Sequence, residues 1–127
     1  MMSDIRVIQT ASAPAAVGPY SQAMVFNGCL FTSGQIPLDP FSGQVVGTNV
    51  REQAELVMKN IAAILDAAGT SFEKVIKTTC FLSDMADFAE FNEVYAGYFV
   101  SKPARSCVAA KTLPKNVLCE VEVIAAV

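Results

Sequence analysis

One arginine and a pair of glutamates give the segment Pro103–Val123 most of the chemistry that this sequence offers. Arg105 has apolar neighbours, and Glu120 and Glu122 alternate with apolar residues near the end of the chain. A guanidinium group is a rigid fork of donors that matches a carboxylate, and a partly desolvated carboxylate can position or deprotonate water. These residue types predict a site that binds an anion and handles a water molecule.

The composition disfavours most other chemistries. The 127 residues include no histidine, so Ser–His and Cys–His dyads and imidazole bases are excluded. No GxxxxGK[ST] loop and no GxGxxG motif after a strand is present. Four cysteines occur without a CxxC pair, and Cys29, Cys80 and Cys119 are predicted to be reduced core residues.

Several other polar residues could join such a site. Tyr20 ends a loop from which its hydroxyl can reach a ligand, and Ser33-Gly34 breaks a strand where a hydroxyl and a backbone N–H could approach one. Asn92 shares the apolar face of a predicted helix, so its amide needs a partner. A nearby loop carbonyl is the favoured partner, and the alternative is a donor aimed at a site.

Structural explanations compete with each of these functional ones. An arginine and a glutamate on neighbouring strands more often form a cross-strand ion pair than a site. Arg105 and Cys107 share one face of their strand, Glu120 and Glu122 share one face of theirs, and the register of the expected hairpin decides whether the faces coincide. Tyr20 and Cys107 could equally be core residues. Spacing alone therefore favours the ion pair.

The elements that position these residues can be read from apolar patterns and turn residues. Asn27-Gly28 marks a tight hairpin turn. The β-branched run at Val75–Leu82 is typical of a central strand. Strands are expected at Ile5–Thr10, Ala23–Asn27, Cys29–Ser33, Val75–Leu82, Ala104–Ala110 and Val117–Ala125, with a loop that leads from Asp39 to Gln44–Val46.

Two helices are expected between these strands. The first begins after Asn49, an N-cap with Glu52 completing a capping box, and ends at Gly69. The second covers Met85–Val100 and is capped by Asp84. Two helices alternating with antiparallel strands suggest one α+β domain over residues 1–127, with the helices on one face of the sheet.

The uncovered face of this sheet leads to an expectation about assembly. Hydrophobic residues make up 53% of the chain and the mean hydropathy is +0.42, which is high for a small soluble monomer. No segment approaches the length of apolar sequence that a membrane span needs. We therefore expect the second apolar face to meet another subunit in a homo-oligomer.

Charge and the N-terminal segment limit partners and location. The net charge is −3 and the basic residues are scattered, which disfavours nucleic-acid binding and a basic membrane-surface helix. The N-terminal segment lacks the apolar stretch of a signal peptide and is a poor transit peptide. The cytoplasm is the expected location, and an organellar copy is left open.

The motifs together resemble one known family. They are GPYSQA at Gly18–Ala23, SGQIPLDP at Ser33–Pro40, QAELVMKNIAAILDAAG at Gln53–Gly69, VIKTTCFLSDMADFAEFNEVYAGYF at Val75–Phe99, and the closing PARSCV and LPKNVLCEVEVIA. Over nearly its whole length the chain is similar to the Rid (YjgF) family, and most of all to its RidA-type 2-iminobutanoate/2-iminopropanoate deaminases. The combined match is highly specific, whereas any one motif alone is weak.

This resemblance implies a fold and an activity. The family has a chorismate-mutase-like α+β sandwich, a mixed β-sheet packed on two α-helices, with a trimeric barrel-like core and sites between subunits of a homotrimer. RidA-type members hydrolyse enamine/imine intermediates such as 2-iminobutanoate and 2-iminopropanoate to 2-oxo acids and ammonia, without a metal or an organic cofactor. The small 2-imino and 2-oxo acids would be the ligands.

The resemblance also implies roles for residues. Arg105 would clamp the substrate carboxylate and Glu120 would orient or activate the attacking water. The remaining cleft positions would be Tyr20, Ser33, Gly34, Asn92 and the backbone around Cys107. Cys119 and the ending EVEVIAAV depart from the commoner family pattern, which affects the expected substrate preference more than the reaction class.

A second hypothesis is a non-enzymatic trimer that binds ligands or acts as a chaperone or translation regulator. Proteins resembling this family have been described as translation inhibitors, ribonucleases and chaperones. The acidic balance and the absence of a basic stripe weigh against direct RNA binding.

Overall fold

The structure is a computed structural model that describes residues 4–127; the part of the N-terminal prediction that concerns residues 1–3 lies outside them. The strands are β1 (Arg6–Ile8), β2 (Ala23–Phe26), β3 (Cys29–Thr32), β4 (Val75–Leu82), β5 (Ala104–Ala109) and β6 (Cys119–Ala126). The helices are α1 (Val50–Ala67) and α2 (Phe88–Tyr98), with short 3₁₀ turns at Phe72–Lys74, Met85–Asp87 and Pro114–Asn116.

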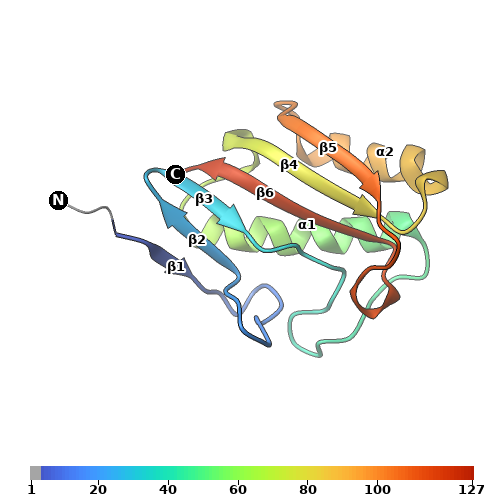
Figure 1. Ribbon diagram of the computed structural model, residues 1–127, viewed down its shortest axis with the longest axis horizontal. Coiled ribbons are helices and arrows are strands. Elements are labelled where there is room, and N and C mark those ends of the chain that lie inside the picture. Colours follow the sequence, from blue (N-terminus) through green and yellow to red (C-terminus); the bar gives the residue numbers. More distant parts are fainter. Residues whose placement is uncertain (1–3) are drawn as a thin grey trace.

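The strands form one six-stranded sheet in the order β1-β2-β3-β6-β4-β5 (Figure 1). Neighbouring strands are antiparallel except β4 and β5, which are parallel and are connected through α2. A parallel pair needs such a crossover, because a tight hairpin joins only antiparallel strands. The α+β class with a mixed sheet and two helices, predicted from the sequence, is confirmed.

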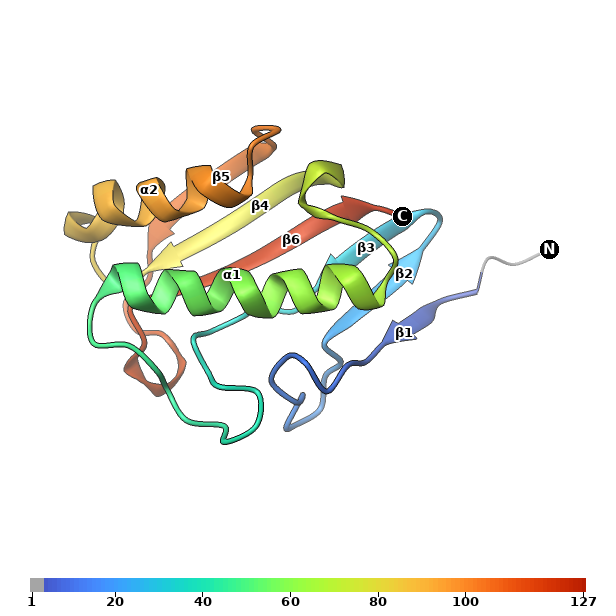
Figure 2. The same cartoon turned by 180° about the vertical axis from the view of Figure 1, so that it is seen from behind.

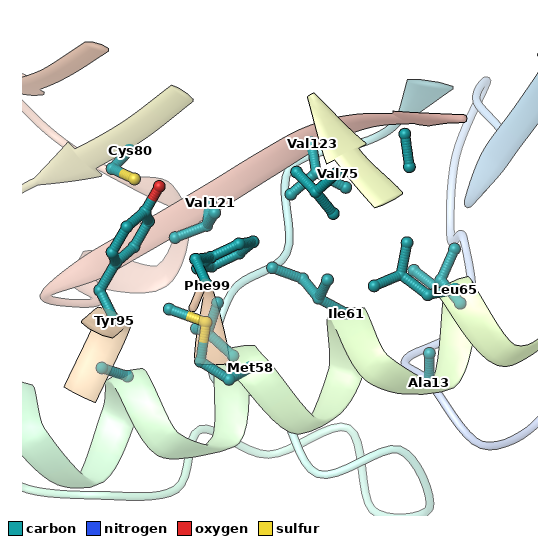
Figure 3. Close-up of a cluster of buried hydrophobic side chains, with 14 of the residues drawn as sticks. Ala13, Met58, Ile61, Leu65, Val75, Cys80, Tyr95, Phe99, Val121 and Val123 are labelled. Atoms are coloured by element: carbon teal, nitrogen blue, oxygen red, sulfur yellow. The ribbon is translucent and has the colours of Figure 1, made fainter. Parts of the chain in front are cut away.

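Both helices cover the same face of the sheet (Figure 2). Met58, Ile61 and Leu65 of α1 pack against Val121 and Val123 of β6, and all five side chains are buried (Figure 3). Truncating one of these side chains to alanine typically costs roughly 2–5 kcal/mol, because the surrounding core cannot close the cavity. The helix face of the sheet is therefore a rigid support for residues that point toward α1 and α2.

The turn and cap residues behave largely as the sequence predicts. Asn27 and Gly28 have φ values of 51° and 76°, the left-handed conformations that a two-residue hairpin turn needs. Asn49 caps α1 by accepting a hydrogen bond from the Glu52 N–H at 2.9 Å. The Glu52 carboxylate accepts from the Thr48 N–H at 2.9 Å, so the expected capping box closes one residue earlier than predicted.

The loop after β3 agrees with the prediction, and the start of the second helix does not. The segment that leads to Gln44–Val46 is a turn-rich loop with an isolated bridge between Leu38 and Val45. The second helix begins later than expected: Asp84 caps a 3₁₀ turn by accepting from the Ala86 N–H at 2.9 Å, and α2 follows at Phe88. The contact of Asp84 with Ala86, two residues later, accompanies a 3₁₀ turn at Met85–Asp87 in place of the first turn of the expected α-helix.

The other face of the sheet carries no helix (Figure 1). Several large apolar side chains on it are exposed in the single chain. Val7 pairs with Met24 and Met24 with Phe31, which places the three exposed side chains on this face. Because large apolar patches are rare on monomers, this surface suits the predicted contact with another subunit, and that contact remains a prediction. Within residues 4–127, no helix combines the length and hydrophobicity required to cross a membrane.

Candidate active site

Arg105 lies on β5 and points toward the helices. Its partner in the parallel register is Thr78 of β4, which is fully buried beneath α2. The Arg105 Nη1 donates to the Asn92 Oδ1 at 2.7 Å, and its Cζ lies 4.7 Å from the ring centroid of Tyr95 and 5.5 Å from that of Phe88. A guanidinium group has five N–H donors, so the bond to Asn92 leaves most of them for a ligand.

The contacts of Arg105 come from one face of α2. Phe88, Asn92 and Tyr95 are spaced by four and three residues, which aligns them on one side of the helix. The Asn92 amide oxygen accepts from Arg105, so the favoured bond to a loop carbonyl is wrong. The hydrogen-bonding need of Asn92 on this apolar face is thus met by Arg105, and the same bond helps to hold Arg105 in place.

Cys107 shares the face of Arg105, as predicted from their spacing. Its side chain is half-buried against the core, and its register partner is the buried Cys80. Burial raises the pKa of the Cys107 thiol, and the Arg105 charge opposes this only in part. Burial also raises the pKa of Cys80 and of Cys119 to about 12. These thiols are protonated near neutral pH, which fits packing better than nucleophilic attack.

A cavity of about 300 Å³ opens beside Arg105. The side chains around the guanidinium group are mostly apolar, so few protein groups compete for its free donors. Its lining residues are Tyr95, Ala96, Phe99, Val100, Lys102, Pro103 and Arg105. This arrangement can receive an anionic group of a small molecule.

Glu120 lies on β6 and points to the opposite face of the sheet. Its register partner is Phe81, whereas the neighbouring Val121 and Cys119 are buried under the helices. Burial raises the pKa of the Glu120 carboxyl, and the negative charge of Glu122 raises it further. A carboxylate with a raised pKa is a better proton acceptor than an ordinary one, so Glu120 is suited to handle a water molecule.

Gly34 makes room for the Glu120 carboxyl group. A Cβ atom at Gly34 would lie 2.9 Å from the Glu120 Cδ, closer than real Cβ contacts allow. The position is held by a bridge in which Gln35 and Val121 exchange two backbone hydrogen bonds, at 2.8 and 3.1 Å. A side chain at this position of the SGQ motif would therefore displace the Glu120 carboxyl group.

A cleft of about 430 Å³ brings Glu120 together with Tyr20, Ser33 and Gly34. Tyr20 is 54% exposed, so the alternative of a core aromatic is wrong. The Ser33 hydroxyl donates to the Ser21 carbonyl at 2.6 Å, which leaves its oxygen free to accept from a ligand. The other lining residues are Pro14, Ala15, Gln22, Gln35, Ile36, Leu38 and Pro114.

Two buried amides that sequence reasoning missed hold the walls of this cleft. The Gln22 side chain accepts from the Thr10 N–H at 2.7 Å and donates to the Thr10, Ala13 and Pro14 carbonyls. The Asn60 amide donates to the Ile36 and Leu38 carbonyls at 3.3 and 3.0 Å. An asparagine in the middle of an apolar helix is the sequence signal for such a contact, because it must find partners.

The candidate residues therefore form two groups rather than one. Arg105, Asn92 and Cys107 lie on the helix side of the sheet, and the Glu120 cleft lies on the other side. Because β4 separates β5 from β6, the predicted hairpin between them does not form. In residues 4–127 the salt bridge present joins Arg51 and Glu93, so the predicted ion pair of Arg105 with a glutamate is wrong.

The part of the chain that the structure describes has no group of three or more His, Cys, Asp or Glu side chains placed to hold a metal ion. The two groups place a guanidinium with free N–H donors on one face and a carboxyl group with a raised pKa on the other. Fold and site thus define a small α+β protein whose available chemistry is carboxylate binding combined with proton transfer.

Comparison with known proteins identifies the family. The family model described as Endoribonuclease L-PSP matches residues 10–127. The human 2-iminobutanoate/2-iminopropanoate deaminase is 48% identical over 121 residues, which cover 94% of this chain and 88% of that protein. The chain belongs to the Rid (YjgF) family, as the sequence motifs predicted.

Solved structures agree with this assignment. The Rid family protein YyfA from Yersinia pestis has a TM-score of 0.95 and 47% identity, over 98% of this chain and 100% of that one. The E. coli TdcF structure with bound serine has a TM-score of 0.91 and 44% identity, over 96% of this chain and 98% of that one. The whole domain, rather than a part of it, is shared with these proteins.

Proposed function

We propose that this protein is a cofactor-free imine deaminase that hydrolyses small 2-imino acids in sites shared between two subunits of a homotrimer. The observation that carries the proposal is the division of the site residues between the two faces of one sheet. Arg105 with free donors lies on one face, and Glu120 with a raised pKa lies on the other. The resemblance to the human deaminase supports the same reaction class.

The reaction needs little from the protein. Water adds to the C=N carbon of the protonated imine, the resulting carbinolamine loses ammonia, and a 2-oxo acid remains. In net terms one iminium carboxylate and one water give one 2-oxo carboxylate and one ammonium ion. A protonated imine is already a strong electrophile, so holding it beside one water can supply several kcal/mol of the required barrier reduction.

Each of the two groups of residues has a role in these reaction steps. Arg105 donates two parallel N–H hydrogen bonds to the substrate carboxylate, while Asn92 holds its Nη1. Glu120 takes a proton from the attacking water and returns it to the departing nitrogen. Tyr20, Ser33 and the backbone around Cys107 line the space between them.

Association of two subunits would bring these groups together. The sheet of one chain separates its own Arg105 from its own Glu120, so one substrate cannot touch both. A second copy that packs its sheet face near the edge strand β5 can place its Glu120 cleft opposite this arginine. The apolar helix-free face supplies the surface that such packing would bury.

The test is an assay in which a serine or threonine dehydratase generates the imine in place. Wild-type protein should speed the release of 2-oxo acid, and Arg105→Ala and Glu120→Gln should each lose this effect. Arg51→Ala and Glu122→Gln are matched controls, because Arg51 bonds only an exposed Glu93 and Glu122 lies outside the cleft. An Arg105→Ala variant that folds normally and keeps the wild-type rate would contradict the proposal.

The alternative of a non-enzymatic ligand-binding, chaperone or translation-regulating trimer makes a different prediction. It expects saturable binding of 2-oxobutanoate without any effect of the protein on the lifetime of the imine. Both variants would then change binding while the rate of 2-oxo acid release stays that of the dehydratase alone. The two functions are thus separated by one pair of measurements on the same proteins.

A further inference from the structure

Arg105 contacts two aromatic rings that the proposed reaction does not use, and the ring of Tyr95 is nearer to it than that of Phe88. We propose that Tyr95, anchored by the buried hydroxyl of Thr78, is a positioning residue that sets the plane of the Arg105 guanidinium group. The inference deepens the proposed function and rests on it for the identity of the ligand. The contacts among Arg105, Tyr95 and Thr78 that support the inference are formed without any ligand.

The guanidinium group needs a second restraint besides its hydrogen bond. The bond from Nη1 to Asn92 Oδ1 fixes one end of the group at 2.7 Å, but the group could still swing about that bond. The ring of Tyr95 lies 4.7 Å from the Arg105 Cζ, within the range of a favourable cation–π contact. Because the attraction is strongest over the ring face, this contact restricts the swing.

Tyr95 is itself fixed by a buried hydrogen bond. Its hydroxyl lies 2.7 Å from the Thr78 Oγ1, and Thr78 is 0% exposed. In Figure 3 the Tyr95 hydroxyl points from α2 toward β4, beside Cys80. Thr78 is also the register partner of Arg105, so the three residues form a closed set of contacts across two strands and one helix.

The hydroxyl pair has no obvious value for packing. Phenylalanine and valine would fill nearly the same volumes without placing two polar groups in the core, where each needs a partner. The pair does tie the Tyr95 ring to the strand beside Arg105. Bidentate recognition of a carboxylate depends on the plane of the guanidinium, so a fixed ring prepares Arg105 for its ligand.

The first test measures the order of the Arg105 side chain without ligand. The chain has three arginines, Arg6, Arg51 and Arg105, so the Arg105 Nε–H signal can be assigned with an Arg105→Lys variant. In the wild type its NMR order parameter should be high. In Tyr95→Leu it should fall below about 0.6, the range of flexible groups. An unchanged order parameter overturns the inference.

The second test measures the Kd for 2-oxobutanoate. Tyr95→Leu should raise the Kd about tenfold, the size expected when a desolvated cation–π contact is lost. In an Arg105→Lys background the same change should alter the Kd less than about twofold, because the residue acts through the guanidinium. Equal effects in both backgrounds overturn the inference.

Conservative variants guard against a folding defect. Tyr95→Phe and Thr78→Val each remove one hydroxyl and should each raise the Kd about two- to threefold, and the double variant should be no worse than either. Phe72→Leu is the matched control, since its ring contacts Tyr98 and Phe99 rather than Tyr95. It should lower the Tm and leave the Kd and the order parameter unchanged.

The two proposals can fail separately. Wild-type protein that does not speed imine hydrolysis overturns the deaminase proposal, and the order parameter still decides the role of Tyr95. A fully active enzyme in which Phe72→Leu changes the Kd as much as Tyr95→Leu overturns the positioning role instead. Disorder of Arg105 confined to the Tyr95 and Thr78 variants supports it.

Discussion

Arg105 and Glu120 project from opposite faces of one β-sheet. Arg105 shares the buried face of Thr78, and Glu120 pairs with Phe81 on the face that carries no helix. The strand β4 also lies between them. Two groups arranged in this way cannot act on one small molecule within a single chain, and this relationship generates the first prediction.

Mixed oligomers of two inactive variants should regain activity. If each site takes Arg105 from one subunit and Glu120 from the next, a mixed trimer of Arg105→Ala and Glu120→Gln chains contains one intact site. Random assembly from equal amounts should restore about a quarter of the wild-type sites. The measurement is 2-oxo acid release after the two proteins are unfolded and refolded together.

The control mixes Arg105→Ala chains with chains that carry both substitutions. No arrangement of these chains contains an intact Arg105, so no activity should return. Recovery in the first mixture alone supports a site shared between subunits. A first mixture as inactive as the control contradicts the shared site, provided that mass spectrometry shows mixed assemblies.

The pH dependence of the reaction should report on Glu120. This carboxylate must be ionised to accept a proton, so kcat/KM should fall as the pH drops through its pKa. Burial and the Glu122 charge both raise that pKa. The acid limb should therefore lie above the range of an ordinary glutamate. Glu120→Gln should lower the rate by about 10²–10⁴-fold on the plateau above this limb, and by less below it, where the wild-type carboxylate is protonated.

Glu122 offers a test of the direction in which its charge shifts the pKa of Glu120. Removing the Glu122 charge in Glu122→Gln relieves repulsion and lowers the pKa of Glu120, because the ionised form is then less disfavoured. The acid limb of the kcat/KM profile should move to lower pH while the plateau rate is kept. A limb that stays in place or moves upward would mean that another group controls it.

The sequence predicted local elements and residue types well because these depend on short-range rules. The run Val75–Leu82, the Asn27-Gly28 turn and the Asn49 cap are recovered as strand, hairpin and N-cap. The last two strands show the limit: the strands expected at Ala104–Ala110 and Val117–Ala125 both form, yet they are not neighbours, because β4 lies between them. Such pairings are set by tertiary structure rather than by local propensity.

The candidate site shows the same difference between what local sequence predicts and what tertiary structure decides. Residue types singled out Arg105 and Glu120, but β6 inserts between β3 and β4, and no local signal in the sequence shows this. The expected hairpin, and the ion pair that depended on it, therefore failed. Asn92 was recognised as a polar residue that needs a partner, yet only the packing of α2 on β5 makes that partner Arg105.

Gly34 should be intolerant of a side chain. A methyl group in Gly34→Ala would lie 2.9 Å from the Glu120 Cδ and 3.1 Å from its Cγ, so the carboxyl group must shift. Displacement of a catalytic group by about 1 Å can cost about 10²-fold in rate. We expect a loss of that size in kcat/KM, measured with the dehydratase assay, with folding retained by circular dichroism.

Gly97→Ala is the matched control for this substitution. Gly97 lies in α2 and a Cβ atom there meets no atom within 4 Å. Alanine should stabilise the helix by about 0.5–1 kcal/mol and leave the rate unchanged. Equal rates for the two variants would show that the close approach of Gly34 to Glu120 does not matter for the reaction.

Gln22 should contribute to stability out of proportion to its size. Its buried side chain makes one bond to the Thr10 N–H and three to the carbonyls of Thr10, Ala13 and Pro14. In Gln22→Leu these backbone groups lose their partner, and an unsatisfied buried group costs about 1–3 kcal/mol. We expect the free energy of unfolding in urea to fall by about 2–4 kcal/mol.

The same variant should also loosen the wall of the Glu120 cleft. Hydrogen exchange should become faster in the loop of residues 11–19, and KM should rise, because Tyr20 and Pro14 line the cleft. Gln44→Leu, at an exposed position of another loop, should change the unfolding free energy by less than about 0.5 kcal/mol. Similar losses of stability in the two variants would contradict the role assigned to Gln22, because the exposed glutamine holds no comparable set of backbone groups.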